Sequence, residues 1–296
     1  MTTATATQVK IKNILFATDF SPASNRAIPY IKNLARHYKA NIFAVHVRPP
    51  VVNPMTPPAS WQAEIETAKV VDEEHRKELL ESFEDLPTNV LIQEGPFESL
   101  LTAAIRRNDI DLVVIGTRGR TGVGKLLLGS IAEEILRTID CPVLTVGPHA
   151  DSSRTIPGEF TEIVCATDLK SEPNEMAEYA VSLAQQFRAR IALVHVVPNP
   201  DPHAPERYDV GDSARELLKT LVPLGVEVVS KPEYFVKAGD PAERILEIAE
   251  ETDADLIVIG AHPEKGIPGA AIHLPFAVAH KVVANAKCPV LSIRGK

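Results

Sequence analysis

The chain has 296 residues, 45% of them hydrophobic, which suits two domains with sizeable cores better than one. Its formal net charge of -8 argues against general nucleic-acid binding, which requires a basic face, although it leaves room for a local basic patch. Three cysteines are too few for a disulfide framework, and no apolar run approaches the roughly 20 residues that cross a bilayer. We therefore expect a cytoplasmic protein with no membrane partner.

The first half of the chain alternates predicted strands and helices. Apolar runs predict strands at 12–18, 41–47, 89–93, 111–116 and 142–146. Amphipathic spacing predicts helices at 21–39, 61–85, 98–109 and 131–140. Ser21 is the expected N-cap of the first helix, with Pro22 at its first position.

The second half repeats the first. NILFATDFS from Asn13 returns as EIVCATDLK from Glu162, and the later runs AVHV, DLVVIG and CPVL return in the same order as LVHV, DLIVIG and CPVL. A segment rich in polar residues, Gly and Pro at 147–160 separates the copies and reads as a linker. One domain has therefore been duplicated, and we assign the two copies to residues 1–148 and 159–296.

Strands rich in Val, Ile and Leu with helices between them predict an α/β fold. We expect two tandem doubly wound domains, each with its own five-stranded parallel sheet in the order 3-2-1-4-5 and helices on both faces. The fifth strands, Val143–Val146 and Val290–Ile293, are edge strands that need covering, so we expect them to pack against each other across a pseudo-twofold axis. Pairing is thus expected within one chain, or between two chains as a homodimer.

Ligands bind such sheets at the carboxyl ends of the strands, where the connections switch direction. The first strand ends at Ala17-Thr18-Asp19 and the fourth at Gly116, so these two ends should lie side by side.

A glycine-rich stretch, GTRGRTGVGKLLLGS, follows the fourth strand from Gly116 to Ser130. From Gly119 it spells G-x-x-x-x-G-K, but Leu126 stands where a P-loop needs Ser or Thr to hold magnesium. Gly129 and Ser130 offer a better phosphate site, because they open the next helix, where free amides and the helix dipole favour an anion.

The glycines have the spacing G-x2-G-x9-G-S, and ATD after the first strand, HV ending the second and CPVL opening the fifth accompany them. In this combination, which covers both copies, the chain resembles the universal stress protein family, nucleotide-binding type, in its tandem form. The resemblance implies dimeric packing through the fifth strands. It also implies a stress-response sensor or regulator that binds ATP, alone or with Mg²⁺, and acts on a regulatory protein partner that the sequence does not identify.

The resemblance also implies residue roles. Asp19 would hold the ribose or adenine side of ATP, the backbone of Val47 would recognise adenine, and Gly116 would contact ribose. The residues that would line the triphosphate are Arg118, Gly119, Gly129, Ser130 and Ile131. The alternative for Asp19 is that its side chain only caps the following turn.

The second copy has lost this cradle. Pro263 stands where Gly119 was, while Phe276 and Ala277 replace Gly129 and Ser130. Proline has no amide hydrogen to donate to a phosphate. Asp168, the counterpart of Asp19, survives, but we expect one ATP per chain, in the first copy.

No paired-carboxylate or Ser-His-Asp constellation stands out, so we assign no catalytic residue. Three histidines at 262, 273 and 280 match no common metal-ligand spacing, so we assign no metal site. Two alternatives to a nucleotide-binding regulator stay open: a slow ATP hydrolase or phosphoryl transferase, and an interaction module without nucleotide. The sequence also leaves open AMP or a cyclic nucleotide in place of ATP.

Overall fold

The structure is a computed structural model that describes residues 8–51, 58–117, 130–150, 156–169, 175–197, 210–223, 226, 228–260 and 274–294. At 58–59, 130–131, 210 and 274–276 it describes the backbone alone.

The first half contains five strands and five helices among the described residues. In chain order they are β1 Asn13–Ala17, α1 Pro22–Asn25, α2 Ile28–Tyr38, β2 Asn41–Arg48, α3 Pro58–Ser82, β3 Thr88–Glu94, α4 Phe97–Arg107, β4 Leu112–Gly116, α5 Ser130–Thr138 and β5 Val143–Val146.

The described part of the second half repeats the alternation. Its elements are β6 Glu162–Ala166, α6 Glu175–Phe187, β7 Arg190–Val197, α7 Val210–Thr220, β8 Glu233–Ala238, α8 Pro241–Glu251, β9 Leu256–Gly260, α9 Leu274–Asn285 and β10 Val290–Ile293.

The helix predicted at 21–39 is in fact two helices. Ser21 caps α1 as expected, since its side chain accepts from the backbone N–H of Ser24, and Pro22 occupies the first helical turn. The chain then breaks before α2, whose first turn contains Pro29. A proline is tolerated in the first turn but not in a helix interior, which explains why a new helix begins here.

Within each half the strand order is 3-2-1-4-5, as the sequence predicts. The whole order is β3-β2-β1-β4-β5-β10-β9-β6-β7-β8, and the neighbours within each half pair in parallel. The fifth strands pair with each other, antiparallel, with Leu144 opposite Leu291. This confirms the pairing predicted for them.

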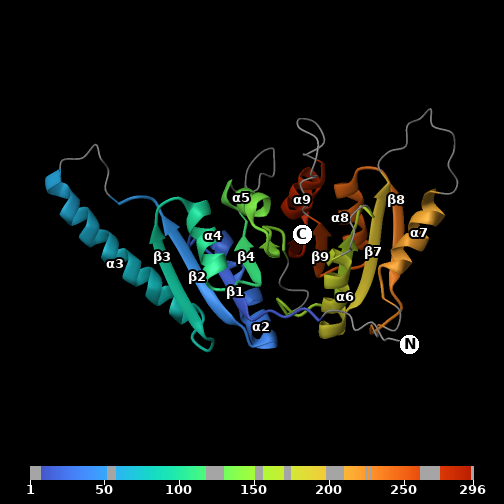
Figure 1. The fold of residues 1–296 in the computed structure, drawn as a ribbon, viewed down its shortest axis with the longest axis horizontal. Coiled ribbons are helices and arrows are strands. Elements are labelled where there is room, and N and C mark those ends of the chain that lie inside the picture. The colour runs from blue at the N-terminus through green and yellow to red at the C-terminus, as the bar shows by residue number, and fades with distance from the viewer. Residues whose placement is uncertain are drawn as a thin grey trace.

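The expectation of two separate five-stranded sheets is wrong, because the β5–β10 pair joins them into one ten-stranded sheet. The physical reason is that an edge strand leaves a row of N–H and C=O groups without partners. Antiparallel pairing satisfies both rows at once. The halves lie side by side along the longest axis of the molecule, with α3 at one end and α7 at the other (Figure 1).

Helices cover both faces of the sheet, as a doubly wound fold requires. One core holds Phe16 and Ile31 together with the buried residues of α3, α6 and α7. The other holds Leu15 and Ile135 together with the buried residues of α4, α8 and α9. Neighbouring residues of β1 thus enter opposite cores, since side chains alternate along a strand. Because the strands are buried on both faces of the sheet, their sequences are continuously apolar.

Candidate functional site

The predicted switch point lies at the carboxyl end of β1. This strand sits between β2 and β4, with Ala17 opposite Val45 on one side and Ile115 on the other. After β1 the chain continues to β2 on one side of β1 and then to β3. It next crosses to β4, which lies on the other side of β1. The residues that follow β1 and those that end β4 are therefore neighbours, as the sequence predicts.

The turn after β1 is held by the buried side chain of Thr18. The Thr18 N–H donates to the Val45 carbonyl at 3.0 Å, and its Oγ1 accepts from the N–H of Phe20 at 3.0 Å. The Thr18 and Ser24 hydroxyls are also 3.0 Å apart. Phe20 has a left-handed backbone with φ of 59°. The chain thus turns sharply out of the sheet directly after Asp19.

Asp19 is exposed at this edge. Its Oδ1 accepts a hydrogen bond from the backbone N–H of Ser21 at 3.0 Å, so the turn-capping role that the sequence left open is present. That bond also fixes the orientation of the carboxylate. A capping role and a ligand role are compatible, since a carboxylate has about four acceptor positions.

The backbone of Val47 faces the place where β1 has left the sheet. Alternate residues of a parallel strand hydrogen-bond to opposite neighbours. The Val45 carbonyl accepts from Thr18 on the β1 side, whereas the Arg48 carbonyl accepts from the Gly95 N–H on the β3 side at 3.3 Å. Val47 shares the orientation of Val45, so its N–H and C=O point past the end of β1. This orientation suits recognition of a flat polar ring.

Gly116 has a structural role that the sequence reasoning did not foresee. A Cβ atom at this position would lie 2.1 Å from the Ala23 carbonyl oxygen and 2.6 Å from the Ser24 Cα. Helix α1 therefore packs directly on the end of β4, and only glycine permits the contact. The glycine was expected to admit a ligand, whereas the packing of α1 requires it whether or not a ligand binds.

The structure describes little of the other predicted site residues. Arg118, Gly119 and Gly129 lie outside the described residues. Ser130 and Ile131 are the first two residues of α5, where the sequence predicts a helix to open, and their side chains are not described. The structure thus brings Asp19, the Val47 backbone and Gly116 together at one edge.

Three aromatic rings beside this turn were missed by the sequence reasoning. Phe20 stacks on His75 of α3, and both rings lie edge-on to His46 of β2. His46 Nδ1 lies 2.9 Å from the Thr18 carbonyl oxygen. Because a carbonyl only accepts, Nδ1 carries the proton. The ATD motif signals Thr18, but no local pattern signals the Phe20–His75 pair.

The second half builds the same turn. The Thr167 N–H donates to the Val194 carbonyl, Leu169 has φ of 60° and donates to Thr167 Oγ1, and His195 Nδ1 contacts the Thr167 carbonyl at 2.9 Å. Asp168 is exposed like Asp19.

The helix that follows the fourth strand differs between the halves. Ala277, the counterpart of Ser130, is the fourth residue of α9, whereas Ser130 is the first residue of α5. Pro275 lies in the first turn of α9 and has no amide hydrogen. The start of this helix in the second half is therefore both displaced and poorer in donors.

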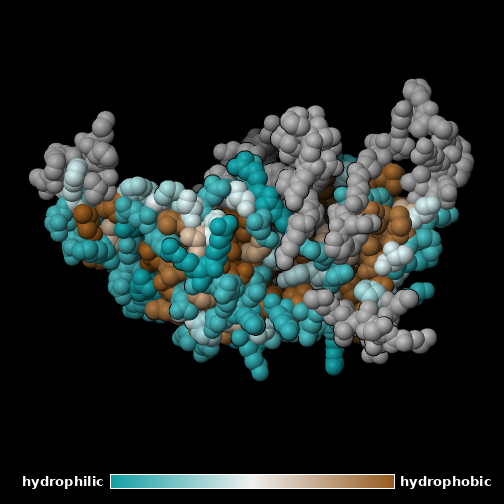
Figure 2. Space-filling model, viewed as in Figure 1, coloured by the Kyte–Doolittle hydropathy of each residue, from teal (hydrophilic) through white to brown (hydrophobic). Residues whose placement is uncertain are grey.

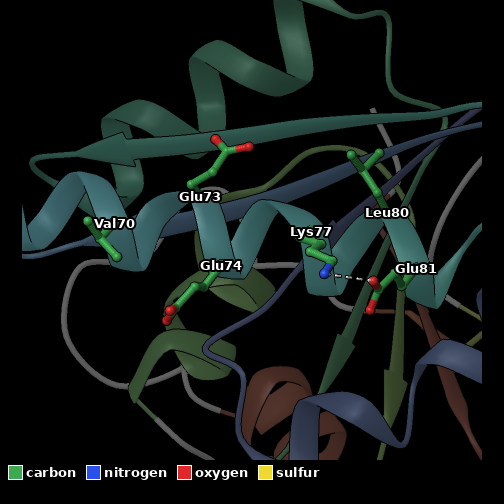
Figure 3. Close-up of a pocket in the computed structure, with 6 residues that line it drawn as sticks. All are labelled: Val70, Glu73, Glu74, Lys77, Leu80 and Glu81. Atoms are coloured by element: carbon green, nitrogen blue, oxygen red, sulfur yellow. Dashed lines mark ion pairs between the residues drawn. The ribbon is translucent and has the colours of Figure 1, made fainter.

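Two other features are not part of the site. A shallow groove on the outer face of α3 has all of its lining residues on that one helix: Val70, Glu73, Glu74, Lys77, Leu80 and Glu81 (Figure 3). Burial raises the pKa of the Cys141 and Cys165 thiols to about 12, which keeps both cysteines protonated and unreactive at neutral pH.

The fold and the edge just described define a duplicated doubly wound α/β protein with a polar turn at the carboxyl end of each first strand. The sequence model of the universal stress protein family matches residues 10–147 and 159–294, so the chain belongs to this family.

Its similar proteins include single-domain and tandem members. A universal stress protein of Methanocaldococcus jannaschii is 30% identical over 139 residues, which cover 46% of this chain and 81% of that protein. One of Mycolicibacterium smegmatis is 25% identical over 297 residues and covers 95% of this chain and 96% of its own length.

A solved universal stress protein structure from Archaeoglobus fulgidus superposes with a TM-score of 0.69. It is 19% identical, and the match covers 95% of this chain and 98% of that chain. This likeness concerns the fold. Among the residues described here, none of the helices combines the length and apolar character that a membrane crossing needs.

Proposed function

We propose that this universal stress protein binds ATP at the carboxyl edge of β1 and β4 and acts as a cytoplasmic stress-response sensor or regulator. It would work through nucleotide-dependent conformation or binding of a protein partner. The observation that carries the proposal is the exposed Asp19 carboxylate at the switch point, next to outward-facing backbone groups of Val47 and followed in sequence by G-x2-G-x9-G-S.

Each group has chemistry that suits one part of ATP. The Asp19 carboxylate accepts hydrogen bonds from a ribose hydroxyl or an adenine amino group. The N–H and C=O of Val47 form a donor and acceptor pair that matches the edge of a base. Gly129, Ser130 and Ile131 would supply amides around the start of α5, with Arg118 and Gly119 from the preceding loop, and these groups favour the triphosphate, which would bring any Mg²⁺ with it.

We further propose that the domain at 159–296 is a structural partner in an intrachain pseudo-dimer. It presents Asp168 on the same turn as Asp19, but Pro263 and Phe276 replace the glycines that would let a phosphate approach. An aspartate alone contributes one or two hydrogen bonds, which is too little to hold a triphosphate in water.

Calorimetric titration of ATP into nucleotide-free protein tests the proposal. We expect one ATP per chain. Asp19→Ala removes a hydrogen bond to a charged group, worth about 1.5–3 kcal/mol, and so weakens affinity by roughly 10- to 150-fold. Asp168→Ala is the matched control because its turn has the same geometry, and it should leave affinity unchanged. Gly129→Val should block phosphate approach.

Two results would contradict specific parts of the proposal. Two ATP per chain, or equal losses from Asp19→Ala and Asp168→Ala, would overturn the asymmetry between the halves. No binding of ATP, AMP or a cyclic nucleotide by the wild type would overturn the nucleotide assignment and favour an interaction module.

A further inference from the structure

Three aromatic rings from separate parts of the chain meet beside the Asp19 turn. The Phe20 and His75 ring centroids are 3.9 Å apart with an interplanar angle of 13°, which is a face-to-face stack. Phe20 and His46 are 4.8 Å apart at 66°, and His46 and His75 are 5.4 Å apart at 72°. Phe20 follows β1, His46 belongs to β2, and His75 belongs to α3. The cluster thus ties the turn to a helix that starts far from it in sequence.

The turn itself is rigid around Asp19. Phe20 is left-handed, a conformation that costs energy for a residue with a Cβ. Its N–H donates to Thr18 Oγ1, and the next N–H, of Ser21, donates to Asp19 Oδ1. Asp19 lies between these bonds and directly precedes Phe20, so a force on the Phe20 ring acts on the backbone that carries the Asp19 carboxylate.

The second half shows which contacts the turn needs and which are additional. Leu169 replaces Phe20 and keeps the same φ and the same hydrogen bond to Thr167 Oγ1. A leucine has no ring to stack, so the shape of the turn does not depend on the stack. The stack occurs in the half that carries the glycine motif, and its additional effect is to attach the turn to α3.

Helix α3 contacts the body of the protein through residues at 72–83. Leu79 and Phe83 are buried, Arg76 Nη1 donates to the Val90 carbonyl at 3.0 Å, and Asp72 Oδ2 lies 3.2 Å from Arg48 Nε. The N-terminal end of α3 extends beyond the sheet (Figure 1), and hydrophobic colour reaches the surface at this end of the molecule (Figure 2). His75 lies between the contacts made by Asp72 and Arg76.

His75 contributes its ring rather than a hydrogen bond at Nδ1. That nitrogen is buried and has no hydrogen-bond partner among the described residues. A phenylalanine at this position would keep the stacking face, whereas an alanine would remove it. The two substitutions therefore separate stacking from mere occupancy of the position.

From these contacts we propose that His75 is a positioning residue for the nucleotide site, and that its stack with Phe20 couples the position of α3 to the Asp19 carboxylate. The proposal rests on the proposed function only for its ligand. Movement of α3 changes the affinity for nucleotide, and nucleotide binding in turn steadies α3, because coupling between two sites is reciprocal.

Hydrogen exchange in the nucleotide-free protein tests the coupling without any ligand. We expect His75→Ala to speed exchange of the amides at 20–21 and of those at 72–78 in α3, and His75→Phe to leave both near the wild-type rate. Phe20→Leu, which places the residue of the second half in the first, removes the same stack and should speed exchange at both places as His75→Ala does. This variant also serves if His75→Ala does not fold.

His37→Ala is the matched control. His37 stacks on Phe187 with ring centroids 4.2 Å apart at 16°, a similar pair, and it lies in the last turn of α2, at the opposite edge of the sheet. Its loss should leave the amides at 20–21 unchanged. Faster exchange at 20–21 in His37→Ala to the extent seen in His75→Ala would show a general loss of stability and overturn the proposal.

ATP titration supplies the second readout. His75→Ala should weaken affinity by about two- to tenfold, the range expected for loss of one aromatic pair, and His75→Phe should restore it. Unchanged affinity and exchange in His75→Ala, or His75→Phe behaving like His75→Ala, would overturn the positioning role. Failure of the wild type to bind nucleotide, with the exchange results as expected, would overturn the proposed function and leave the coupling of α3 to the turn intact.

Discussion

Gly116→Ala should destabilise the protein whether or not nucleotide is present. The added methyl group would lie 2.1 Å from the Ala23 carbonyl oxygen, well inside van der Waals contact, and 2.6 Å from the Ser24 Cα. Both clashes are with backbone atoms, so no side-chain rotation relieves them. Helix α1 must move instead, and Ser24 is buried and bonded to the Ser21 carbonyl at 2.9 Å. Overpacking of this kind costs about 1–3 kcal/mol.

Thermal and urea unfolding measure this loss. At about 2–4 °C per kcal/mol for a domain of this size, the melting temperature should fall by roughly 2–12 °C. Gly211→Ala is the control, because nothing lies within 4 Å of its added Cβ and it sits in helix α7. It should be neutral or stabilising by up to about 1 kcal/mol. If Gly116→Ala is as stable as the wild type, the α1–β4 packing argument is refuted.

Further predictions concern the sheet junction and the thiols. Thr145 and Ser292 are buried, and their hydroxyl oxygens have no hydrogen-bond partner among the described residues. Thr145→Val should therefore raise the unfolding free energy by up to about 1–3 kcal/mol in urea titrations, and a loss of stability would show that the hydroxyl is satisfied. With pKa values of about 12, Cys141 and Cys165 should resist iodoacetamide at pH 8 and react once the chain unfolds; rapid labelling of the folded protein, mapped by mass spectrometry, would contradict the burial argument.

The sequence predicts most of the fold because its strands are buried on both faces. Five apolar runs in each copy, with helices between them, indicate a parallel sheet covered on both faces, and the ends of the first and fourth strands indicate a switch point at Asp19 and Gly116. The prediction of separate sheets failed although the pairing of Val143–Val146 with Val290–Ile293 was foreseen. Backbone pairing of two edge strands makes one sheet, so these two expectations were incompatible.

The candidate site was less predictable because its parts depend on tertiary contacts. The ATD motif locates Asp19, but the left-handed Phe20 and its stack on His75 join residues that no local pattern connects. Gly116 was predicted to contact the ribose, and the close approach seen in the structure is that of α1. A glycine in a sequence marks close approach without showing what approaches.

The duplication separates the parts of the site that build the scaffold from those that select a ligand. The threonine and histidine of the turn keep the same bonds in both halves, around Thr18 and around Thr167, and an exposed aspartate follows each threonine. A feature present in both halves cannot explain a difference between them. If only the first half binds nucleotide, its selectivity must come from the features that differ: the glycine loop, the start of α5 at Ser130, and the Phe20–His75 stack. The aspartate then supplies affinity only where these features have already placed the ligand.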